Sequence, residues 1–568
     1  MSFLGLSLVA GIPALRAAEG VGGPVVEMPA FVITEPRPSE RAWRYAEAEG
    51  FEIISQVSDD ATQQVFAALW RGPRLTLPPA LRPNPATPTA VIIFDQEGDR
   101  AAGPSSLGSL KKEHEQSSHW TNVIKRTLPD REVFCVNLAG RYFTYSSTFR
   151  FDLRTLLALH TPAAPPWLLE ALYGAYGLYR EGIEYPDRGK HAGVVSALWC
   201  KEAELIRAEQ LVGLANSYFD TAPEKRRGAI AAAPALRDAM VSPAALWTGG
   251  SAEDRRSPDE NARWAASCAL FVRWGLYAQD GKRHDALWRF AAEACGRVVD
   301  EAFFRECFGI GYDEVRDEMA WYLPIALGER TSRPIAPLVV PPLALRPATK
   351  SEVARVRGDW ERGEATLLQA RFPEIAAKYG AKAGRTLRAA YAADPTDVRL
   401  AAVLGLYEFE SGDNPRALAL LAAATVGGQA RPRAWFTLAH LRFFEINGRI
   451  GARAPIPHVD ALPVLLPLEQ AWRQEPAMTV TYELLAELWR RCPDLSAVEV
   501  LARLQEGQKR FPRNTRLTLA AFRAALERGE RAGARGFLDA GLPFVTDPAL
   551  RERLEQARQA LANAPVAK

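Results

Sequence analysis

The chain has 568 residues, with 70 Lys or Arg against 67 Asp or Glu and a formal net charge of +3 at pH 7. This length exceeds what one hydrophobic core supports, so we expect several domains or repeats. The basic residues form no long run, which argues against a nucleic-acid partner. The six cysteines include no Cys-x-x-Cys pair, which excludes zinc-ribbon and thioredoxin-like sites. We expect buried free thiols, and a disulfide between Cys295 and Cys307 is the alternative.

Residues 1–18 are apolar and end in the small residues Ala17 and Ala18. This pattern predicts a signal peptide and therefore a periplasmic or secreted bacterial protein. A frayed N-terminus of a cytosolic protein is the alternative, since no Lys or Arg precedes the apolar stretch and Arg16 lies beside the expected cleavage point. No later stretch reaches the roughly 20 apolar residues that a membrane helix needs, so we expect no transmembrane segment.

Residues 19–42 are rich in Gly, Pro and Glu and predict a linker with one short β-type run at 30–34. Residues 43–328 then combine β-type runs with helical patterns, which predicts an α+β domain with a small sheet and a helical lobe. The last two β-type runs are expected to form a hairpin around Gly140. The β-type runs are 51–55, 90–95, 133–138 and 142–145, and the helical patterns include 60–70, 261–277, 284–297 and 312–323.

A Pro-rich stretch at 329–350 predicts an extended linker, because closely spaced prolines cannot continue a helix or a central strand. Residues 351–562 are helix-forming almost throughout, so the chain as a whole is expected to be mainly helical. Small residues recur twelve positions apart, as in Gly405 and Ala417, and prolines recur at intervals close to the length of a helix pair. These prolines are Pro395, Pro432, Pro476 and Pro512.

The pattern in 351–562 resembles tetratricopeptide repeats, an all-α solenoid of stacked helix pairs. In such repeats small residues let two antiparallel helices approach closely, and a proline ends the second helix. Two features depart from the pattern: residues 448–457 interrupt one unit, and Glu408 lies where an aromatic residue is usual. A generic helical bundle is the alternative.

One segment after the predicted sheet resembles a zinc-peptidase site without its zinc ligands. A gluzincin-type peptidase places His-Glu-x-x-His on a helix, so that two imidazoles face one ion and the Glu acts as general base. Here residues 150–154 read Arg-Phe-Asp-Leu-Arg. Glu170 follows in a Pro-Trp-Leu-Leu-Glu segment that is similar to the one that supplies the third ligand in these peptidases. The resemblance implies an inactive gluzincin-like domain over 43–328 that holds no metal or cofactor.

We interpret the segment as a charge-compensated relic of a catalytic site. A guanidinium cannot bind a metal cation, and Phe151 replaces the carboxylate that would deprotonate water. Arg150 and Arg154 lie four residues apart on one helical face, where they would pair with Glu170. Solvated arginines on an exposed helix are the alternative. His160 follows on the same helix and is expected to be a polar residue at its end.

These observations favour a non-catalytic exported protein whose repeats bind a protein or peptide in their concave groove. Four aromatic or basic residues are candidates for lining this groove, and each is equally a candidate for the core: Tyr407, Trp435, Arg442 and Trp489. One rival hypothesis is a hydrolase that uses Asp152 and Glu170 as paired carboxylates. Another is a purely structural protein of the cell envelope.

Overall fold

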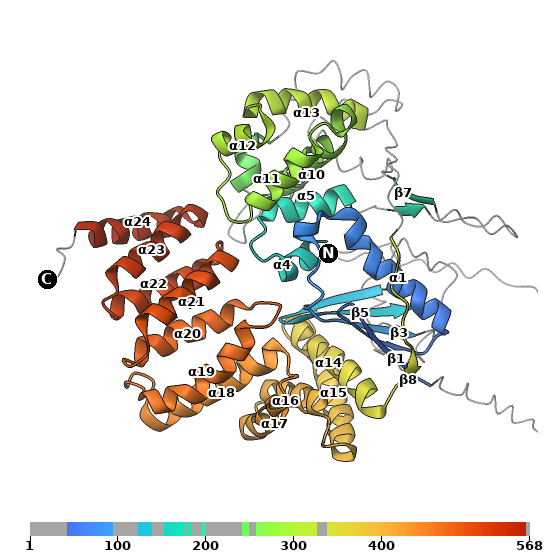
Figure 1. The fold of residues 1–568 in the computed structure, drawn as a ribbon, viewed down its shortest axis with the longest axis vertical. Helices are drawn as coiled ribbons and strands as arrows, with labels where there is room; N and C mark the ends of the chain where they lie inside the picture. The colour runs from blue at the N-terminus through green and yellow to red at the C-terminus, as the bar shows by residue number, and fades with distance from the viewer. Residues whose placement is uncertain are drawn as a thin grey trace, which may run out of the picture. The chain divides into compact units, whose positions relative to one another are not determined.

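The computed structural model describes residues 42–94, 123–138, 153–176, 180–182, 195–199, 241–248, 257–326 and 338–563. These residues belong to one compact unit. The predicted signal peptide, almost all of the linker that follows it and the expected strand at 142–145 lie outside the described residues. As the sequence predicts, the described part is mainly helical and contains a small mixed sheet (Figure 1).

The strands of the sheet are β1 (Arg44–Ala48), β2 (Phe51–Ser55), β3 (Thr89–Phe94), β4 (Val123–Leu128), β5 (Arg131–Asn137) and β8 (Arg346–Pro347). Their order is β4-β5-β3-β2-β1-β8, with β2, β3 and β5 parallel and the remaining pairs antiparallel. The predicted strands 51–55, 90–95 and 133–138 are confirmed as β2, β3 and β5. All of β3 is buried, as expected for a central strand covered on both faces.

β5 forms its hairpin with the strand that precedes it. β4 and β5 pair antiparallel around a tight turn at Asp130. β3 occupies the other edge of β5. The hairpin expected around Gly140 stays a prediction, because its turn and second strand lie outside the described residues. The sequence pattern missed β4 because Lys125 and Arg126 interrupt its apolar run.

The two faces of the sheet pack against different helices, because side chains alternate along a strand. Ile53 points to the face covered by α1 (Asp59–Thr76), a helix that begins close to the predicted position. Its neighbour Ile54 points to the opposite face and packs with Trp360 of α14 (Lys350–Leu368). The first helix after the predicted linker therefore completes the core of the sheet (Figure 1).

The helices between the sheet and the linker form a lobe around an aromatic cluster. Trp167 is fully buried, and its ring centroid lies 4.9 Å from that of Trp247, 5.5 Å from Phe290 and 5.9 Å from Phe271. Aromatic pairs at these distances add to the free energy of burying their surfaces. The cluster is therefore the main core of the lobe.

The predicted helices of the lobe are confirmed, with three ends displaced. α10 begins at Pro258 rather than at 261, α11 ends at Glu293 rather than at 297, and α13 ends at Ala326 rather than at 323. No helix in the described ranges is long and apolar enough to cross a membrane. The elements of this part are α4 (Leu153–His160), α5 (Pro166–Tyr176), β6 (Arg180–Gly182), β7 (Val195–Trp199), α9 (Pro243–Thr248), α10 (Pro258–Tyr277), α11 (His284–Glu293), α12 (Glu301–Phe308) and α13 (Tyr312–Ala326).

Residues 338–347 of the predicted linker are fastened to the sheet domain. β8 pairs with β1, and Gln63 of α1 donates to the carbonyl of Pro341 at 3.1 Å and accepts from the backbone amide of Leu343 at 2.8 Å. The segment is extended, as its prolines require. Its last two residues, which form β8, are an edge strand of the sheet, so this part of the chain is not a flexible linker.

Helices after the linker pack in consecutive pairs, and the first helix of each pair also contacts the first helix of the next. The four marker prolines lie at the junctions between pairs. The helices that follow α14 are α15 (Pro373–Ala393), α16 (Val398–Glu410), α17 (Asn414–Val426), α18 (Pro432–Ile450), α19 (His458–Trp472), α20 (Thr479–Arg491), α21 (Ala497–Arg510), α22 (Thr515–Glu527), α23 (Arg531–Gly541) and α24 (Pro548–Asn563).

Two sequence features of these helices have structural reasons. Gly405 of α16 lets α17 approach, since a Cβ atom there would lie only 2.8 Å from Leu421. Glu408 is fully buried and accepts hydrogen bonds from Arg388 at 2.7 and 2.8 Å, and Arg416 lies 3.2 Å away. The carboxylate that departs from the repeat pattern therefore joins α15, α16 and α17 through ion pairs.

Arg513, at the junction of α21 and α22, connects the last helices to the helical lobe. Its guanidinium donates to the carbonyl oxygens of Ala294 at 2.8 Å and Cys295 at 3.0 Å, just after α11, and also to Ala163. Burial lowers the pKa of Arg513 to about 10, so the side chain is still charged at pH 7. A cation is favourable there because the end of a helix carries partial negative charge.

We expect Arg513→Ala to lower the free energy of unfolding by about 3 kcal/mol, because buried carbonyls lose charge-assisted hydrogen bonds. Urea unfolding followed by circular dichroism measures the change. Arg516→Ala is the matched control, since the Arg516 side chain is 83% exposed and its pair with Glu483 should contribute little. Equal effects of the two substitutions would show that Arg513 does not hold the lobe.

Candidate functional site

The structure describes only part of the predicted relic site. Arg150, Phe151 and Asp152 lie outside the described residues, and of Arg154 only the backbone, in α4, is described. Glu170 is half-buried on α5, which packs against α4. The predicted pairing of the arginines with Glu170 therefore stays a prediction. Among the side chains that are described, no three His, Cys, Asp or Glu residues cluster closely enough to hold a metal ion.

The four residues proposed for the repeat groove do not meet at one surface. Trp489 is fully buried and Trp435 nearly so, in separate core clusters. Tyr407 is half-buried with its ring against Gly384, and Arg442 donates to the carbonyl of Pro463 at 2.9 Å. These side chains hold helices together in the structure.

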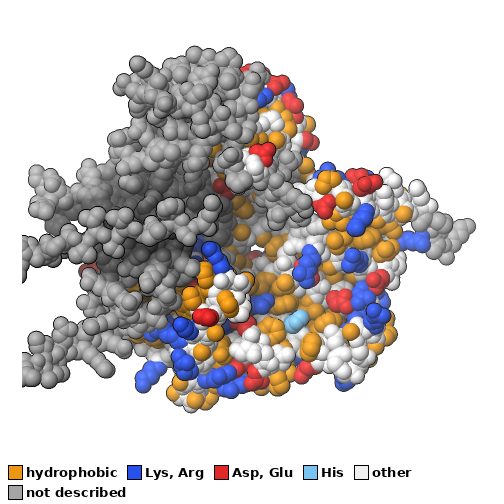
Figure 2. Space-filling view, turned by 180° about the vertical axis from the view of Figure 1, so that it is seen from behind, with side chains coloured by type: hydrophobic (Ala, Val, Ile, Leu, Met, Phe, Trp, Pro, Cys, Tyr) orange, Lys and Arg blue, Asp and Glu red, His pale blue; other side chains and the backbone are white. Residues whose placement is uncertain are grey.

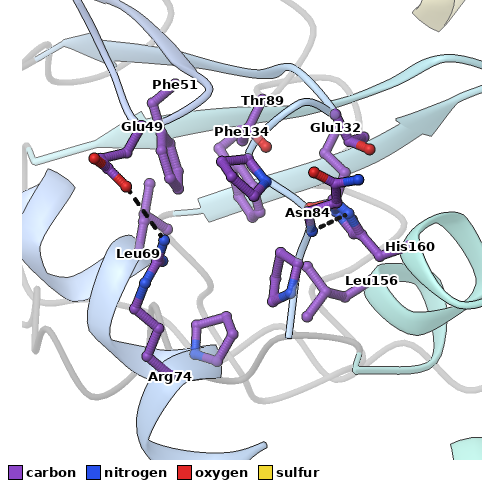
Figure 3. Close-up of a pocket in the computed structure, with 14 residues that line it drawn as sticks. Glu49, Phe51, Leu69, Arg74, Asn84, Thr89, Glu132, Phe134, Leu156 and His160 are labelled. Atoms are coloured by element: carbon purple, nitrogen blue, oxygen red, sulfur yellow. Dashed lines mark hydrogen bonds and ion pairs between the residues drawn. The ribbon is translucent and has the colours of Figure 1, made fainter. Parts of the chain in front are cut away.

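A small cavity lies between α1, α4 and the sheet (Figure 3). His160, the last residue of α4, accepts a hydrogen bond at Nδ1 from the backbone amide of Asn84 at 3.2 Å, and burial lowers the pKa of His160. On the opposite side of the cavity, Glu49 lies 3.6 Å from Arg74. The volume of about 30 Å³ has room for little more than a water molecule, so we do not regard this cavity as a ligand site.

A much larger cleft of about 680 Å³ opens between the end of the sheet and the first helices of three successive pairs. Cavities of this size are typical of ligand sites. Four arginines line it, so we call it the arginine cleft. They are Arg131 at the start of β5, Arg355 on α14, Arg399 on α16 and Arg431 just before α18.

The other walls of the arginine cleft come from the turn between β1 and β2, a nearby loop and the apolar faces of α16 and α18. The turn brings Glu47, Glu49 and Glu52 to the cleft, and the loop contributes two prolines and Ala86. Positive φ angles at Glu49 and Gly50 make this turn tight, and a Cβ on Gly50 would lie 2.2 Å from the carbonyl of Pro85. The turn therefore requires glycine at position 50.

Glu52 is the central acceptor in the floor of the cleft. Its buried carboxylate lies 3.1 Å from Arg131 and 3.1 Å from Arg399, and it also contacts Arg355. Burial alone would raise the pKa of Glu52, but the guanidinium groups of Arg355, Arg131 and Arg399 outweigh burial and lower it to about 2. The carboxylate is therefore ionised at neutral pH.

Asp359 on α14 is a second buried acceptor behind the floor. It lies 3.1 Å from Arg131, 2.7 Å from Arg362 and 2.8 Å from Arg431. Burial opposes ionisation, yet the guanidinium groups of Arg431, Arg362 and Arg131 hold the pKa of Asp359 well below its usual range. Ion pairs therefore run without a break from β2 and β5 to α14, α16 and the start of α18.

The polar side chains that line the arginine cleft are guanidinium and carboxylate groups, together with the amide of Gln429. Its described lining includes no His, Ser, Thr or Cys side chain. Glu52, its buried carboxylate, is held ionised by arginines and so cannot supply a proton at neutral pH. On the face shown in Figure 2, basic, acidic and hydrophobic side chains are interspersed over the described surface, without a large area of one charge.

Sequence reasoning missed this site because its charges come from distant parts of the chain. Arg131 and Asp359, for example, are 228 residues apart. One local signal was present: Glu52 interrupts an otherwise apolar strand, and a buried carboxylate in such a place needs a cationic partner. That signal does not say where the partner lies.

Acid should weaken the fold through Glu52. Because its folded-state pKa of about 2 lies below the ordinary 4.5, its contribution is fully present above about pH 4.5 and is lost as the pH falls toward 2. The loss for this one group is on the order of 3 kcal/mol. Urea unfolding at several pH values measures it. Glu52→Gln should be less stable at pH 7 and should show a shallower acid dependence, and an unchanged slope would contradict the assignment.

Comparisons with known proteins leave the arginine cleft to be interpreted from its own geometry: no family model, no curated protein and no solved structure matches this chain.

Proposed function

We propose that this chain is a non-catalytic, exported binding protein that holds an extended peptide segment of a partner in the arginine cleft. The observation that carries the proposal is the cleft itself, about 680 Å³ in volume, bordered by the first helices of three successive helix pairs. Export rests on the signal-like pattern of residues 1–18.

The lining of the cleft suits a peptide. One wall is apolar, with Val403 and Leu406 of α16 and Ala434 of α18, and the floor presents guanidinium groups. A peptide can place apolar side chains against the apolar wall and backbone carbonyl groups against the guanidinium groups of the floor. Ion pairs fix most of the floor before any ligand arrives, which reduces the entropy lost on binding.

The arrangement of the helices supports a tetratricopeptide-type scaffold. Consecutive helices pack in pairs, first helices contact first helices, and Gly405 permits the close approach expected from the small-residue spacing. Repeats of this kind bind segments of other proteins on the surface that their first helices form. The arginine cleft lies where that surface meets the sheet domain, which we take to be the inactive gluzincin-like part.

A side chain that fills the cleft should abolish binding. The probe is a random pool of fluorescent, C-terminally amidated peptides of about eight residues, roughly 27 Å when extended. We expect the protein to raise the fluorescence anisotropy of this pool and Ala86→Trp, at the exposed rim of the cleft, to remove most of the increase. Ala389→Trp, on the exposed side of α15, is the control and should bind as the unaltered protein does. Binding that survives Ala86→Trp would place the peptide elsewhere.

Metal analysis tests whether the gluzincin-like part is inactive as a zinc peptidase. We expect zinc far below about one equivalent in the purified, untagged protein, because arginines stand at both imidazole positions of the gluzincin-like segment. Inductively coupled plasma mass spectrometry measures it. Stoichiometric zinc would require a catalytic site built from other ligands.

A further inference from the structure

Glu47, at the mouth of the arginine cleft, lies across from Glu52 of the floor on the neighbouring strand. Glu47 of β1 and Glu52 of β2 are direct partners in the antiparallel register. Like charges at such positions repel and destabilise the pair of strands. The repulsion is relieved by Arg399 of α16, which lies 2.5 Å from Glu47 and 3.1 Å from Glu52.

Glu47 and Glu52 differ in how firmly they are held. Glu52 is buried and shared by three guanidinium groups, whereas the Glu47 side chain is 47% exposed and the Arg399 side chain 37% exposed. Besides Arg399, Glu47 accepts a hydrogen bond from the Tyr45 hydroxyl. Glu47 can therefore turn into solvent without uncovering the buried floor, because the tyrosine hydroxyl and Arg399 each keep a contact with Glu52.

We infer that Glu47 is a built-in stand-in for the ligand, and that an acidic side chain of the bound peptide replaces it on Arg399 and the Tyr45 hydroxyl. The inference rests on the proposed function and specifies its ligand. In the free protein, the Arg399 guanidinium and the Tyr45 hydroxyl both donate to the partly exposed carboxylate of Glu47 at the rim. A guanidinium and a hydroxyl form charge-assisted hydrogen bonds that select a carboxylate over an amide.

The exchange explains why the rim and the floor are built differently. When Glu47 turns away, the incoming carboxylate replaces its negative charge beside Arg399. Arg399 keeps its ion pair with Glu52 throughout the exchange. A neutral peptide gains nothing from displacing Glu47, which stays in place and narrows the mouth of the cleft. Selectivity for acidic peptides then arises from competition at one rim position.

The test compares two pools of fluorescent, amidated peptides that differ only in one fixed central position, Glu in one pool and Gln in the other. Glu47→Gln removes the competing carboxylate, so we expect it to lower the Kd of the Glu pool about tenfold while leaving that of the Gln pool nearly unchanged. Glu49→Gln is the matched control, because Glu49 lines the same cleft and carries the same charge but pairs with Arg74. It should change neither Kd appreciably.

Each outcome separates the inference from the proposed function. If Glu47→Gln and Glu49→Gln strengthen binding of the Glu pool equally, the effect is general electrostatics and the exchange is wrong. If both pools bind with equal affinity to every variant, peptide binding stands and only the inference is overturned. If neither pool binds any variant, the proposed function fails, and the inference fails with it. Arg399→Gln, checked for an intact circular dichroism spectrum, should remove the preference for the Glu pool.

Discussion

The rest of this structure depends on the ion pairs that the guanidinium of Arg131 forms with two carboxylates. This guanidinium is buried at the start of β5 and lies 3.1 Å from each of the two carboxylates, Glu52 on the neighbouring part of the sheet and Asp359 on α14. Removing a charge from water costs several kcal/mol unless partners replace the water. The sheet therefore needs α14 in one position and orientation, and the apolar contacts of Trp360 then complete the docking.

The docked α14 also helps to position the helices that follow it against the sheet. Asp359 reaches Arg431 at 2.8 Å, before α18, and Glu52 reaches Arg399 on α16. The helix pairs are thereby set against the sheet by electrostatic contacts as well as by the apolar packing inside each pair. The arginine cleft follows from the same contacts, because the groups that join the two parts also form its floor. Buried ion pairs join the groups of the floor, whereas Glu47 and Arg399 at the rim are partly exposed.

The positions of helices and strands along the chain could be predicted from the sequence far better than the way in which they pack against one another. Periodicity located β2, β3 and β5 and most of the helices, because each pattern depends on neighbours within a few residues. It assigned α14 to a separate repeat region, since an amphipathic helix does not reveal what it packs against. Trp435 and Trp489 were candidates for a binding groove for the same reason. In stacked pairs more than one side of a helix can be covered, and both tryptophans lie in the core.

The candidate site was harder still to predict. Its arginines lie on β5, α14, α16 and the loop before α18, and no local pattern connects them. The segment at 150–154 could be singled out from the sequence because its residues are contiguous. The cleft, in contrast, arises only once distant segments meet.

The position of α14 has a consequence for how the chain is made. During synthesis the strands leave the ribosome well before their cover does, since Arg131 and Asp359 are separated by 228 residues. Until then the apolar face that includes Ile54, Ile92 and Val133 has nothing to pack on, and Arg131 lacks one of its carboxylates. An uncovered sheet face is prone to aggregate. This face of the sheet can therefore complete its core only after α14 has been made.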